Sequence, residues 1–263
     1  MSVRPGDRWR EALAARAVPQ SILDKAPQPQ TGLEPEMFRW RPEEDAEQPV
    51  RPSRRRALEA LPDGGSVLDV GVGGGASSLG LAPRVATITG VDSSQGMLDL
   101  FQASAHEAGV ASRAVLGAWP EIAADVDPED IAVCHHALYN AAEIEDSFFA
   151  LTARARHRVV VEVSAQLPLA RLDPLWESFH GTQRPDCRVA DELCAVLAAL
   201  GLVFEREDVL LPARIPNVSA EMVAFLRRRL CVGSDRDAEI LDHVQALQPS
   251  PQTVVALWWP GAA

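Results

Sequence analysis

The stretch VLDVGVGGGASS, residues 67–78, is the most informative part of this chain. An apolar run ends there at a cluster of glycines, and the residues that follow, 76–82, have the pattern of a helix. Glycines at such a turn let the backbone bend sharply and approach a ligand without a Cβ in the way. The stretch therefore predicts a strand, a glycine-rich loop and a helix that together hold a ligand.

Two glycine patterns fit this loop. Gly71, Gly73 and Ala76 match the dinucleotide pattern G-x-G-x-x-A, whereas Asp69, Gly71, Gly73 and Gly75 match D-x-G-x-G-x-G. Asp69 favours the second pattern, because a carboxylate at the end of a buried strand is costly to desolvate without a cationic or hydrogen-bonding partner. It would also repel a pyrophosphate at this turn. The sequence therefore favours a ligand that carries an ammonium or sulfonium group.

Asp92 is the second candidate for contact with the ligand. It closes the apolar run 85–91 and lies 92 − 71 = 21 positions after Gly71. A carboxylate at the tip of this strand accepts hydrogen bonds from two ribose hydroxyls in nucleoside cofactor sites. The alternative is a helix-capping role before Ser93 and Ser94, and the spacing from the glycines favours the ribose.

Apolar runs and helical patterns alternate on both sides of the loop. We expect strands at 66–70, 85–91, 114–116, 131–134, 158–164, 202–209 and 253–259. We expect helices at 6–17, 53–60, 76–82, 94–108, 143–155, 190–200, 219–231 and 235–247, with Ser94 as an N-cap. This rhythm predicts an α/β fold with a doubly wound, mostly parallel sheet and helices on both faces.

We divide the chain into an N-terminal helical extension and one larger domain. Residues 1–60 are rich in proline and charge, and the segment MFRW within them is expected to cover an edge of the core, with a lid over a pocket as the alternative. Residues 61–263 form the domain, with a core at 61–165, a substrate-side loop at 166–190 and a helical insertion at 217–248 before the last strand.

Composition excludes several classes of protein. The chain has 263 residues, is 47% hydrophobic and carries a formal net charge of −12, which argues against nucleic acid and anionic membranes as partners. The N-terminus has no apolar signal region, so we expect a cytoplasmic protein. The four cysteines are widely spaced and predict free thiols, with no metal site.

VLDVGVGGG followed by TGVDSSQGML resembles the first two motifs of the class I S-adenosylmethionine-dependent methyltransferases. The resemblance covers residues 60 to 165 and implies a seven-stranded sheet of order 3-2-1-4-5-7-6 with an antiparallel last strand. It implies S-adenosyl-L-methionine as cofactor. By resemblance, Asp69 and Gly71 face the methionine part, Asp92 takes the ribose, and Ser93 and Met97 flank the adenine.

The third motif departs from this family. Many members have an acid after the third strand that bonds the adenine amino group, but here the stretch is LGAWP, with Ala118 in its place. The resemblance then leaves the adenine amine to backbone groups or water. Trp119 either stacks on the base or packs against the sheet.

Candidate catalytic residues follow the fourth expected strand, in IAVCHHALYN. Side chains alternate along an extended strand, so His135 and His136 cannot both face one pocket while it stays extended. We expect His135 on the cofactor side and His136 or Tyr139 on the acceptor side, with His180 of the 166–190 loop as a further candidate base. Each histidine has the alternative of merely shaping the pocket.

The sequence thus predicts a methyltransferase that acts on O or N of a small-molecule acceptor. One alternative is a nicotinamide-dependent oxidoreductase, but a Tyr-x-x-x-Lys dyad is missing because the position four after Tyr139 is Glu143. Another is a non-catalytic protein that binds S-adenosylmethionine. The apolar stripe of the 219–231 helix predicts core packing, with a homodimer contact as the alternative.

Overall fold

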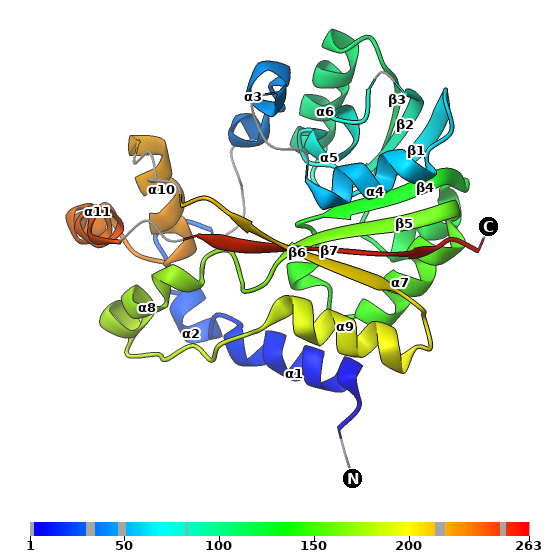
Figure 1. Ribbon diagram of the computed structural model, residues 1–263. Helices are drawn as coiled ribbons and strands as arrows, with labels where there is room; N and C mark the ends of the chain where they lie inside the picture. The colour runs from blue at the N-terminus through cyan, green and yellow to red at the C-terminus, as the bar shows by residue number, and fades with distance from the viewer. Residues whose placement is uncertain are drawn as a thin grey trace.

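A computed structural model describes residues 3–29, 35–46, 51–82, 84–213, 219–247 and 251–262. Its sheet has seven strands in the order β3-β2-β1-β4-β5-β7-β6 (Figure 1). The strands are β1 (Gly65–Val70), β2 (Val85–Asp92), β3 (Ala111–Leu116), β4 (Glu129–His135), β5 (Ala155–Ser164), β6 (Glu205–Leu211) and β7 (Gln252–Pro260). β7 runs antiparallel to both β5 and β6, and the other pairs are parallel. The predicted fold class and strand order are confirmed.

Helices cover both faces of the sheet (Figure 1). One face carries α4 (Pro52–Ala60), α5 (Ala76–Leu79) and α6 (Gln95–Glu107), whose apolar side chains share one buried cluster with the sheet. The other face carries α1 (Pro5–Arg16), α7 (Ile144–Ala153) and α9 (Val189–Ala199). Because β1, β4 and β5 are covered on both faces, their sequences are nearly continuous apolar runs.

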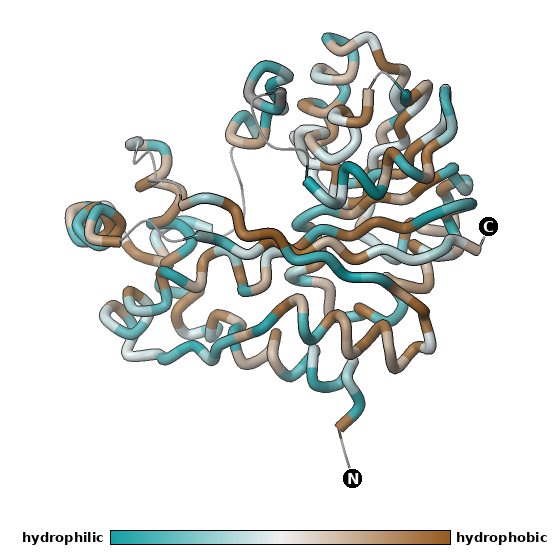
Figure 2. Tube along the Cα trace, viewed as in Figure 1, coloured by the Kyte–Doolittle hydropathy of each residue, from teal (hydrophilic) through white to brown (hydrophobic). Residues whose placement is uncertain are grey.

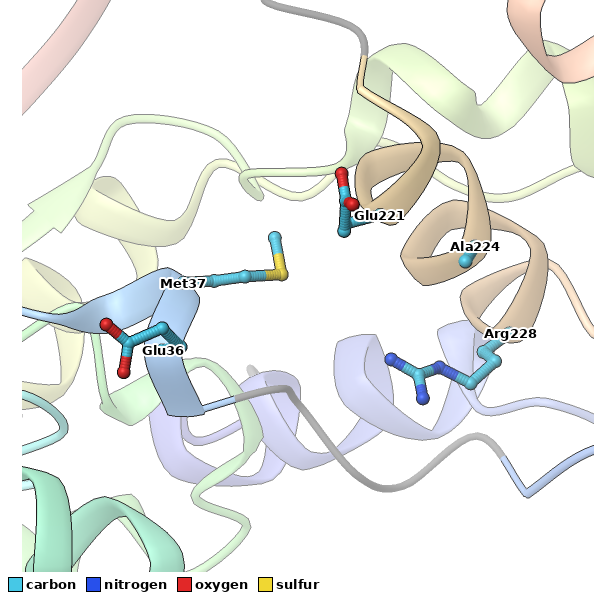
Figure 3. Close-up of a pocket in the computed structure, with 5 residues that line it drawn as sticks. All are labelled: Glu36, Met37, Glu221, Ala224 and Arg228. Atoms are coloured by element: carbon cyan, nitrogen blue, oxygen red, sulfur yellow. The ribbon is translucent and has the colours of Figure 1, made fainter.

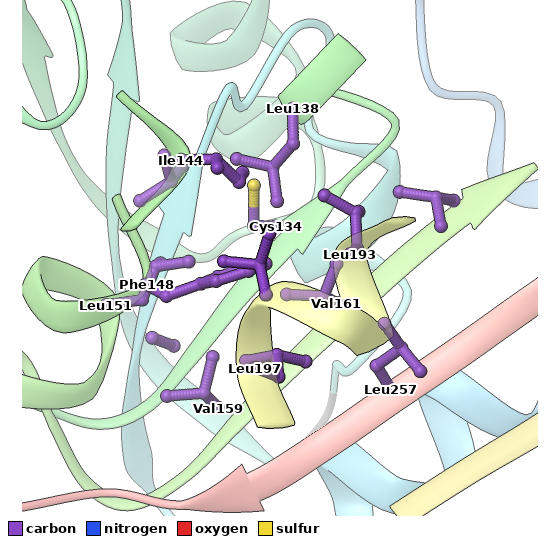
Figure 4. Packing of buried hydrophobic residues seen from close by; sticks show 14 of the residues in the cluster. Cys134, Leu138, Ile144, Phe148, Leu151, Val159, Val161, Leu193, Leu197 and Leu257 are labelled. Atoms are coloured by element: carbon purple, nitrogen blue, oxygen red, sulfur yellow. The ribbon is translucent and has the colours of Figure 1, made fainter. Parts of the chain in front are cut away.

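The core on the α7 and α9 side is drawn in Figure 4. Cys134 and Val161, from adjacent strands, point there toward Phe148 of α7 and Leu193 of α9. The hydropathy trace agrees with this burial, since apolar stretches follow the strands in the middle of the sheet (Figure 2). β6 at the edge alternates exposed and half-buried residues, so it is a more polar strand than its neighbour β7.

The first helix belongs to the main core. Trp9 of α1 is fully buried, and its indole Nε1 donates a hydrogen bond of 2.7 Å to the Ala141 carbonyl. Burying a tryptophan removes a large apolar surface from water, so this side chain is an apolar anchor of α1 to the domain, beside the partly buried Ala12 and Leu13. The N-terminal residues 1–60 therefore do not act as one unit. Helix α1 packs against the same face of the sheet as α7 and α9, whereas the segment around Met37 is not part of this core.

A second, smaller core lies beside the end of the sheet. It joins α2 (Gln20–Leu23), α8 (Asp173–His180), α10 (Ala220–Arg229) and α11 (Asp237–Ala246) around Trp176, Leu230 and Ile240 (Figure 1). Arg16 of α1 joins this core through a bidentate salt bridge to Asp173 of α8, with hydrogen bonds of 2.8 and 3.0 Å. The substrate-side loop and the helical insertion of the sequence analysis thus fold together here. The apolar stripe of α10 contributes Leu226 to this core, as predicted.

Element boundaries differ from the prediction mainly at exposed strands. β3 begins at Ala111 rather than at 114, and β6 spans Glu205–Leu211 rather than 202–209, because edge strands with one exposed face carry little hydrophobic signal. β5 begins at Ala155, where the sequence pattern extended α7. The short elements not predicted are α2, α3 (Pro42–Ala46), α8 and the 3₁₀ turns η1 (Pro35–Phe38), η2 (Glu121–Asp125), η3 (Leu138–Asn140), η4 (Ala170–Leu172) and η5 (Ser234–Arg236).

Candidate active site

The glycine loop connects β1 to α5 and has the backbone that only glycine adopts easily. Gly71, Gly73 and Gly75 have φ values of 72°, 52° and 90°, in the left-handed region. A Cβ on Gly71 would collide with Ala137 at the tip of β4, so the two loops touch. A Cβ on Gly73 would meet no atom of the described residues within 4 Å. The loop is therefore open to a ligand at Gly73 and closed by β4 at Gly71.

Asp69 lies fully buried behind this loop. Ser78 of α5 donates a hydrogen bond of 2.6 Å to its Oδ2, while Oδ1 has no hydrogen-bond partner among the described residues. Burial raises the pKa of Asp69 from 3.8 to about 7, and the hydroxyl bond from Ser78 only partly opposes this. A buried carboxylate oxygen without a partner fits a cationic group of a bound ligand.

Asp92 ends β2 beside the same loop. Its Oδ2 accepts the Gly73 N–H at 3.1 Å, and its Oδ1 accepts the Ser94 N–H at 2.9 Å. Each carboxylate oxygen has a second lone-pair site, so both can still accept a ligand hydroxyl. The backbone bonds fix the direction of the carboxylate and tie it to the glycine loop.

The first turn of α6 follows Asp92. Ser94 is its N-cap, as predicted, with the Met97 N–H donating to Ser94 Oγ at 3.4 Å. Ser93 is exposed, whereas Met97 is buried under the helix. Ser93 is thus accessible at this edge, whereas Met97 is largely shielded from solvent.

The loop after β3 contains the remaining two residues of the predicted cofactor site. Ala118 is exposed. Trp119 packs against the main core, and its indole donates a hydrogen bond of 3.2 Å to the Ser147 carbonyl. This bond ties the loop after β3 to α7.

The tip of β4 brings two histidines to one side of the sheet. His135 is the last strand residue, and His136 has a φ of 55°, which breaks the alternation of an extended strand. Both imidazoles consequently lie near Glu162 of β5. Burial lowers the pKa of His135 to about 4, so its ring is neutral near pH 7, and its Nε2 has no partner among the described residues.

Glu162 is the residue that sequence reasoning missed. It is buried in the middle of the run RVVVEVS, where its isolated charge was the available signal. Its carboxylate accepts hydrogen bonds from Arg51 and Ser53, both at the start of α4, and from His136 Nε2 at 3.0 Å. Burial opposes ionisation, but the His136 bond and the charge of Arg51 outweigh it and hold the pKa of Glu162 below its usual range.

Tyr139 completes this group. Its hydroxyl lies 2.7 Å from His136 Nδ1, accepts the Ser164 N–H at 2.8 Å and lies 3.3 Å from Ser164 Oγ. Burial raises the pKa of Tyr139, so the phenol keeps its proton in the resting protein. The structure therefore places two of the three predicted catalytic residues in contact.

His180 lies in a different part of the molecule. It belongs to α8 in the second core, where its ring packs against Trp176 with centroids 4.9 Å apart. Its Nε2 donates a hydrogen bond of 2.7 Å to the Leu230 carbonyl. The structure does not bring His180 together with His136 and Tyr139.

A short segment of the N-terminal region covers the glycine loop. A Cβ on Gly74 would collide with the carbonyl of Phe38, the last residue of η1. The other side of η1 faces α10 across a pocket of about 460 Å³ lined by Glu36, Met37, Glu221, Ala224 and Arg228 (Figure 3). One segment thus forms a wall of the pocket and a cover of the loop.

Comparison with known proteins agrees with this geometry. Residues 67–159 match the family described as "Methyltransferase domain". The match covers about a third of the chain, and together with the strand order it makes the chain similar to the class I, Rossmann-like, S-adenosylmethionine-dependent methyltransferases. A search of curated protein sequences gives no match.

Several solved structures share the fold at low sequence identity. A methyltransferase from Geobacter sulfurreducens in complex with S-adenosylhomocysteine has 18% identity and a TM-score of 0.53, over 82% of this chain and 95% of its own. The YcgJ protein from Bacillus subtilis has 16% identity and a TM-score of 0.53, over 80% and 98%. The precorrin-6y C5,15-methyltransferase from Geobacter metallireducens has 12% identity and a TM-score of 0.50, over 88% and 100%.

Within the described residues, no three His, Cys, Asp or Glu side chains meet in the manner of a metal site. Nor do they include a helix with the length and hydropathy of a membrane span. The four cysteines are free thiols, with Cys134, Cys187 and Cys231 buried.

Proposed function

We propose that this protein transfers the methyl group of S-adenosylmethionine to an oxygen or nitrogen atom of a small-molecule acceptor. The observation that carries the proposal is the buried Asp69 Oδ1, which has no partner among the described residues and lies behind a glycine loop open at Gly73. The amino acid part of S-adenosylmethionine bears an ammonium group that would satisfy this oxygen. A pyrophosphate at the same place would be repelled by it.

The other contacts to the cofactor follow from the two strand tips. Asp92 would accept the ribose hydroxyls through its free lone-pair sites, and Ser93 and Met97 would flank the adenine. His135 would shape the methionine side with a neutral ring. When bound, the cofactor supplies a sulfonium that activates the methyl carbon, so the protein has to orient the acceptor and handle its proton.

On the acceptor side we propose His136 and Tyr139. The contact of Gly71 with Ala137 supports this, because it places the residue after His136 against the glycine loop. His180 is left out, since it lies in the second core. We further propose that the acceptor enters through the pocket between η1 and α10. The support is that η1 both lines this pocket and covers the glycine loop.

The test begins with ligand binding in a thermal shift assay. S-adenosylhomocysteine at about 100 times its dissociation constant adds about 2.7 kcal/mol to the free energy of unfolding, so the melting temperature should rise clearly. NADP serves as the matched control. A rise with NADP and none with S-adenosylhomocysteine would point to an oxidoreductase instead. Binding without any methylated product from a small-molecule extract would point to a non-catalytic protein.

A further inference from the structure

The three side chains Glu162, His136 and Tyr139 form one continuous chain of hydrogen bonds. It runs from the buried carboxylate through both nitrogens of the imidazole to the phenol, over contacts of 3.0 and 2.7 Å. Each side chain comes from a different place: β5, the residue after β4, and the turn η3. The arrangement is therefore a product of the fold, because only tertiary packing brings these three segments together.

The protonation of each group follows from its partner. Glu162 is ionised, because the Arg51 charge and its hydrogen bonds hold its pKa below the usual range, and an ionised carboxylate only accepts. His136 Nε2 must then carry a proton. In the neutral imidazole the other nitrogen, Nδ1, has the free lone pair, so the hydrogen bond at 2.7 Å is donated by Tyr139.

The Tyr139 oxygen is in turn prepared to lose its proton. It accepts the Ser164 backbone N–H at 2.8 Å, which stabilises negative charge on the oxygen as the proton moves toward His136. The phenol has a single proton to donate, and His136 Nδ1 at 2.7 Å is a nearer acceptor for it than Ser164 Oγ at 3.3 Å. The phenol oxygen is thus the end of the chain of bonds that can receive a further proton.

We propose that Tyr139, His136 and Glu162 form a proton relay that takes the proton of a hydroxyl-bearing acceptor during methyl transfer. The inference rests on the function proposed above and narrows its acceptor to a hydroxyl. Neutral amines already present a lone pair to the methyl carbon and need no base before attack, whereas alcohols and phenols must lose a proton. Tyr139 and His136 carry the proton, and Glu162 is a positioning residue that acts through His136.

Atoms and charges balance in this step. The acceptor hydroxyl gives its proton to Tyr139 Oη while Tyr139 gives its own proton to His136 Nδ1. The acceptor oxygen uses its electron pair to bond the methyl carbon, and the pair of the broken carbon–sulfur bond stays on sulfur. The imidazolium that results lies against the Glu162 carboxylate, and its side chain is 38% exposed, so it returns the proton to water.

The first experiment reads the proton positions directly in the ligand-free protein. In protein labelled with ¹⁵N-histidine, we expect His136 to show a protonated Nε2 and an unprotonated, hydrogen-bonded Nδ1 near pH 8. Its signals are assigned with His136→Asn, because asparagine tolerates a φ of 55°. In Tyr139→Phe the Nδ1 signal should move toward that of a free unprotonated nitrogen. His180, whose Nε2 donates to Leu230, should not change and serves as internal control.

The second experiment separates positioning from folding. Glu162→Gln keeps an acceptor oxygen for Arg51 and His136 Nε2, removes the charge and turns an amide N–H toward Ser53 Oγ, which can accept it, so the tautomer should persist while turnover falls about 10²-fold. Arg158→Ala removes a different bond between β5 and α4, from Arg158 to the Arg56 carbonyl at 2.8 Å, and should lower the melting temperature with little effect on turnover. Equal losses of turnover in both variants would mean that Glu162 only anchors α4, and would overturn its positioning role.

The third experiment identifies the acceptor atom. Purified protein, a small-molecule extract and S-adenosylmethionine with a deuterated methyl group should yield a product with the label on oxygen. A product labelled on nitrogen or carbon overturns the relay and leaves the methyltransferase function intact. A protonated Nδ1 in the first experiment also overturns it. Failure of the proposed function itself would instead appear as absence of S-adenosylhomocysteine binding.

Discussion

Asp69 should make the affinity for S-adenosylhomocysteine depend on pH. In the free protein its pKa is about 7, because burial disfavours its charge, and its Oδ1 has no partner among the described residues. An ammonium at Oδ1 requires the ionised form. With a pKa of about 7, about one tenth of the molecules are ionised at pH 6 and about nine tenths at pH 8. The affinity should therefore rise about tenfold over this range, or ~1.4 kcal/mol.

Asp69→Asn supplies the matched comparison. It retains the shape of the side chain and removes the titration, so its affinity should be weaker at pH 8 and should vary little between pH 6 and 8. Calorimetric titration of both proteins at three pH values measures this, and any pH dependence left in the variant belongs to the ligand. The same steep rise in both proteins would refute a contact between Asp69 and the ammonium.

The stability of the ligand-free protein should change in the opposite direction. The unfolded carboxyl has its ordinary pKa of 3.8, and the folded one holds its proton up to about pH 7. Between these values the folded state binds more protons, so the Asp69 contribution to the free energy of unfolding falls as pH rises from about 4 to 7. It stays constant above that range. Wild type should therefore lose stability relative to Asp69→Asn across this interval, as read by urea unfolding.

Three further predictions concern other parts of the molecule. Trp9→Ala should lower the free energy of unfolding by about 3–5 kcal/mol, whereas Val3→Ala, which is half exposed, should leave the denaturation midpoint unchanged. Asp92→Ala should weaken S-adenosylhomocysteine binding by a factor of about ten or more in calorimetry; unchanged affinity in a folded variant would place the ribose elsewhere. Ala224→Trp should raise the KM of the acceptor several-fold while the affinity for S-adenosylhomocysteine stays constant. A changed affinity for S-adenosylhomocysteine with an unchanged KM would contradict the assignment of this pocket to the acceptor.

The part of the candidate site that we propose to bind the cofactor could be located from the sequence because its signals are local. Asp69, the three glycines and Asp92 lie in two short stretches, each joining one strand to the next helix. The left-handed φ values of Gly71, Gly73 and Gly75 depend on the turn itself, so the residue type alone indicated them. Parallel strands bring both stretches to the same edge of the sheet, which made their meeting predictable from order alone.

The part of the site proposed for the acceptor could be located only in part, because it depends on contacts between distant segments. His136 and Tyr139 were proposed from their place after the fourth strand, and alternation predicted that His135 and His136 cannot both face one pocket while the strand stays extended. The φ of 55° at His136 turns its ring to Glu162, and no pattern in the sequence marks a left-handed histidine. His180 was grouped with them because its loop follows the fifth strand, while the second core holds it elsewhere.

The sequence by itself determined the strands of the sheet and the position of the glycine loop, because apolar periodicity and glycine placement act over neighbouring residues, whereas the strand order was expected only from the resemblance of two motifs to a known family. The tertiary structure decided which remote groups meet. Arg51 and Ser53 reach Glu162 across more than a hundred residues, and η1 lies over Gly74 while its other side faces α10. Such contacts form only when the whole chain is packed, since the fold decides which polar side chains are desolvated together.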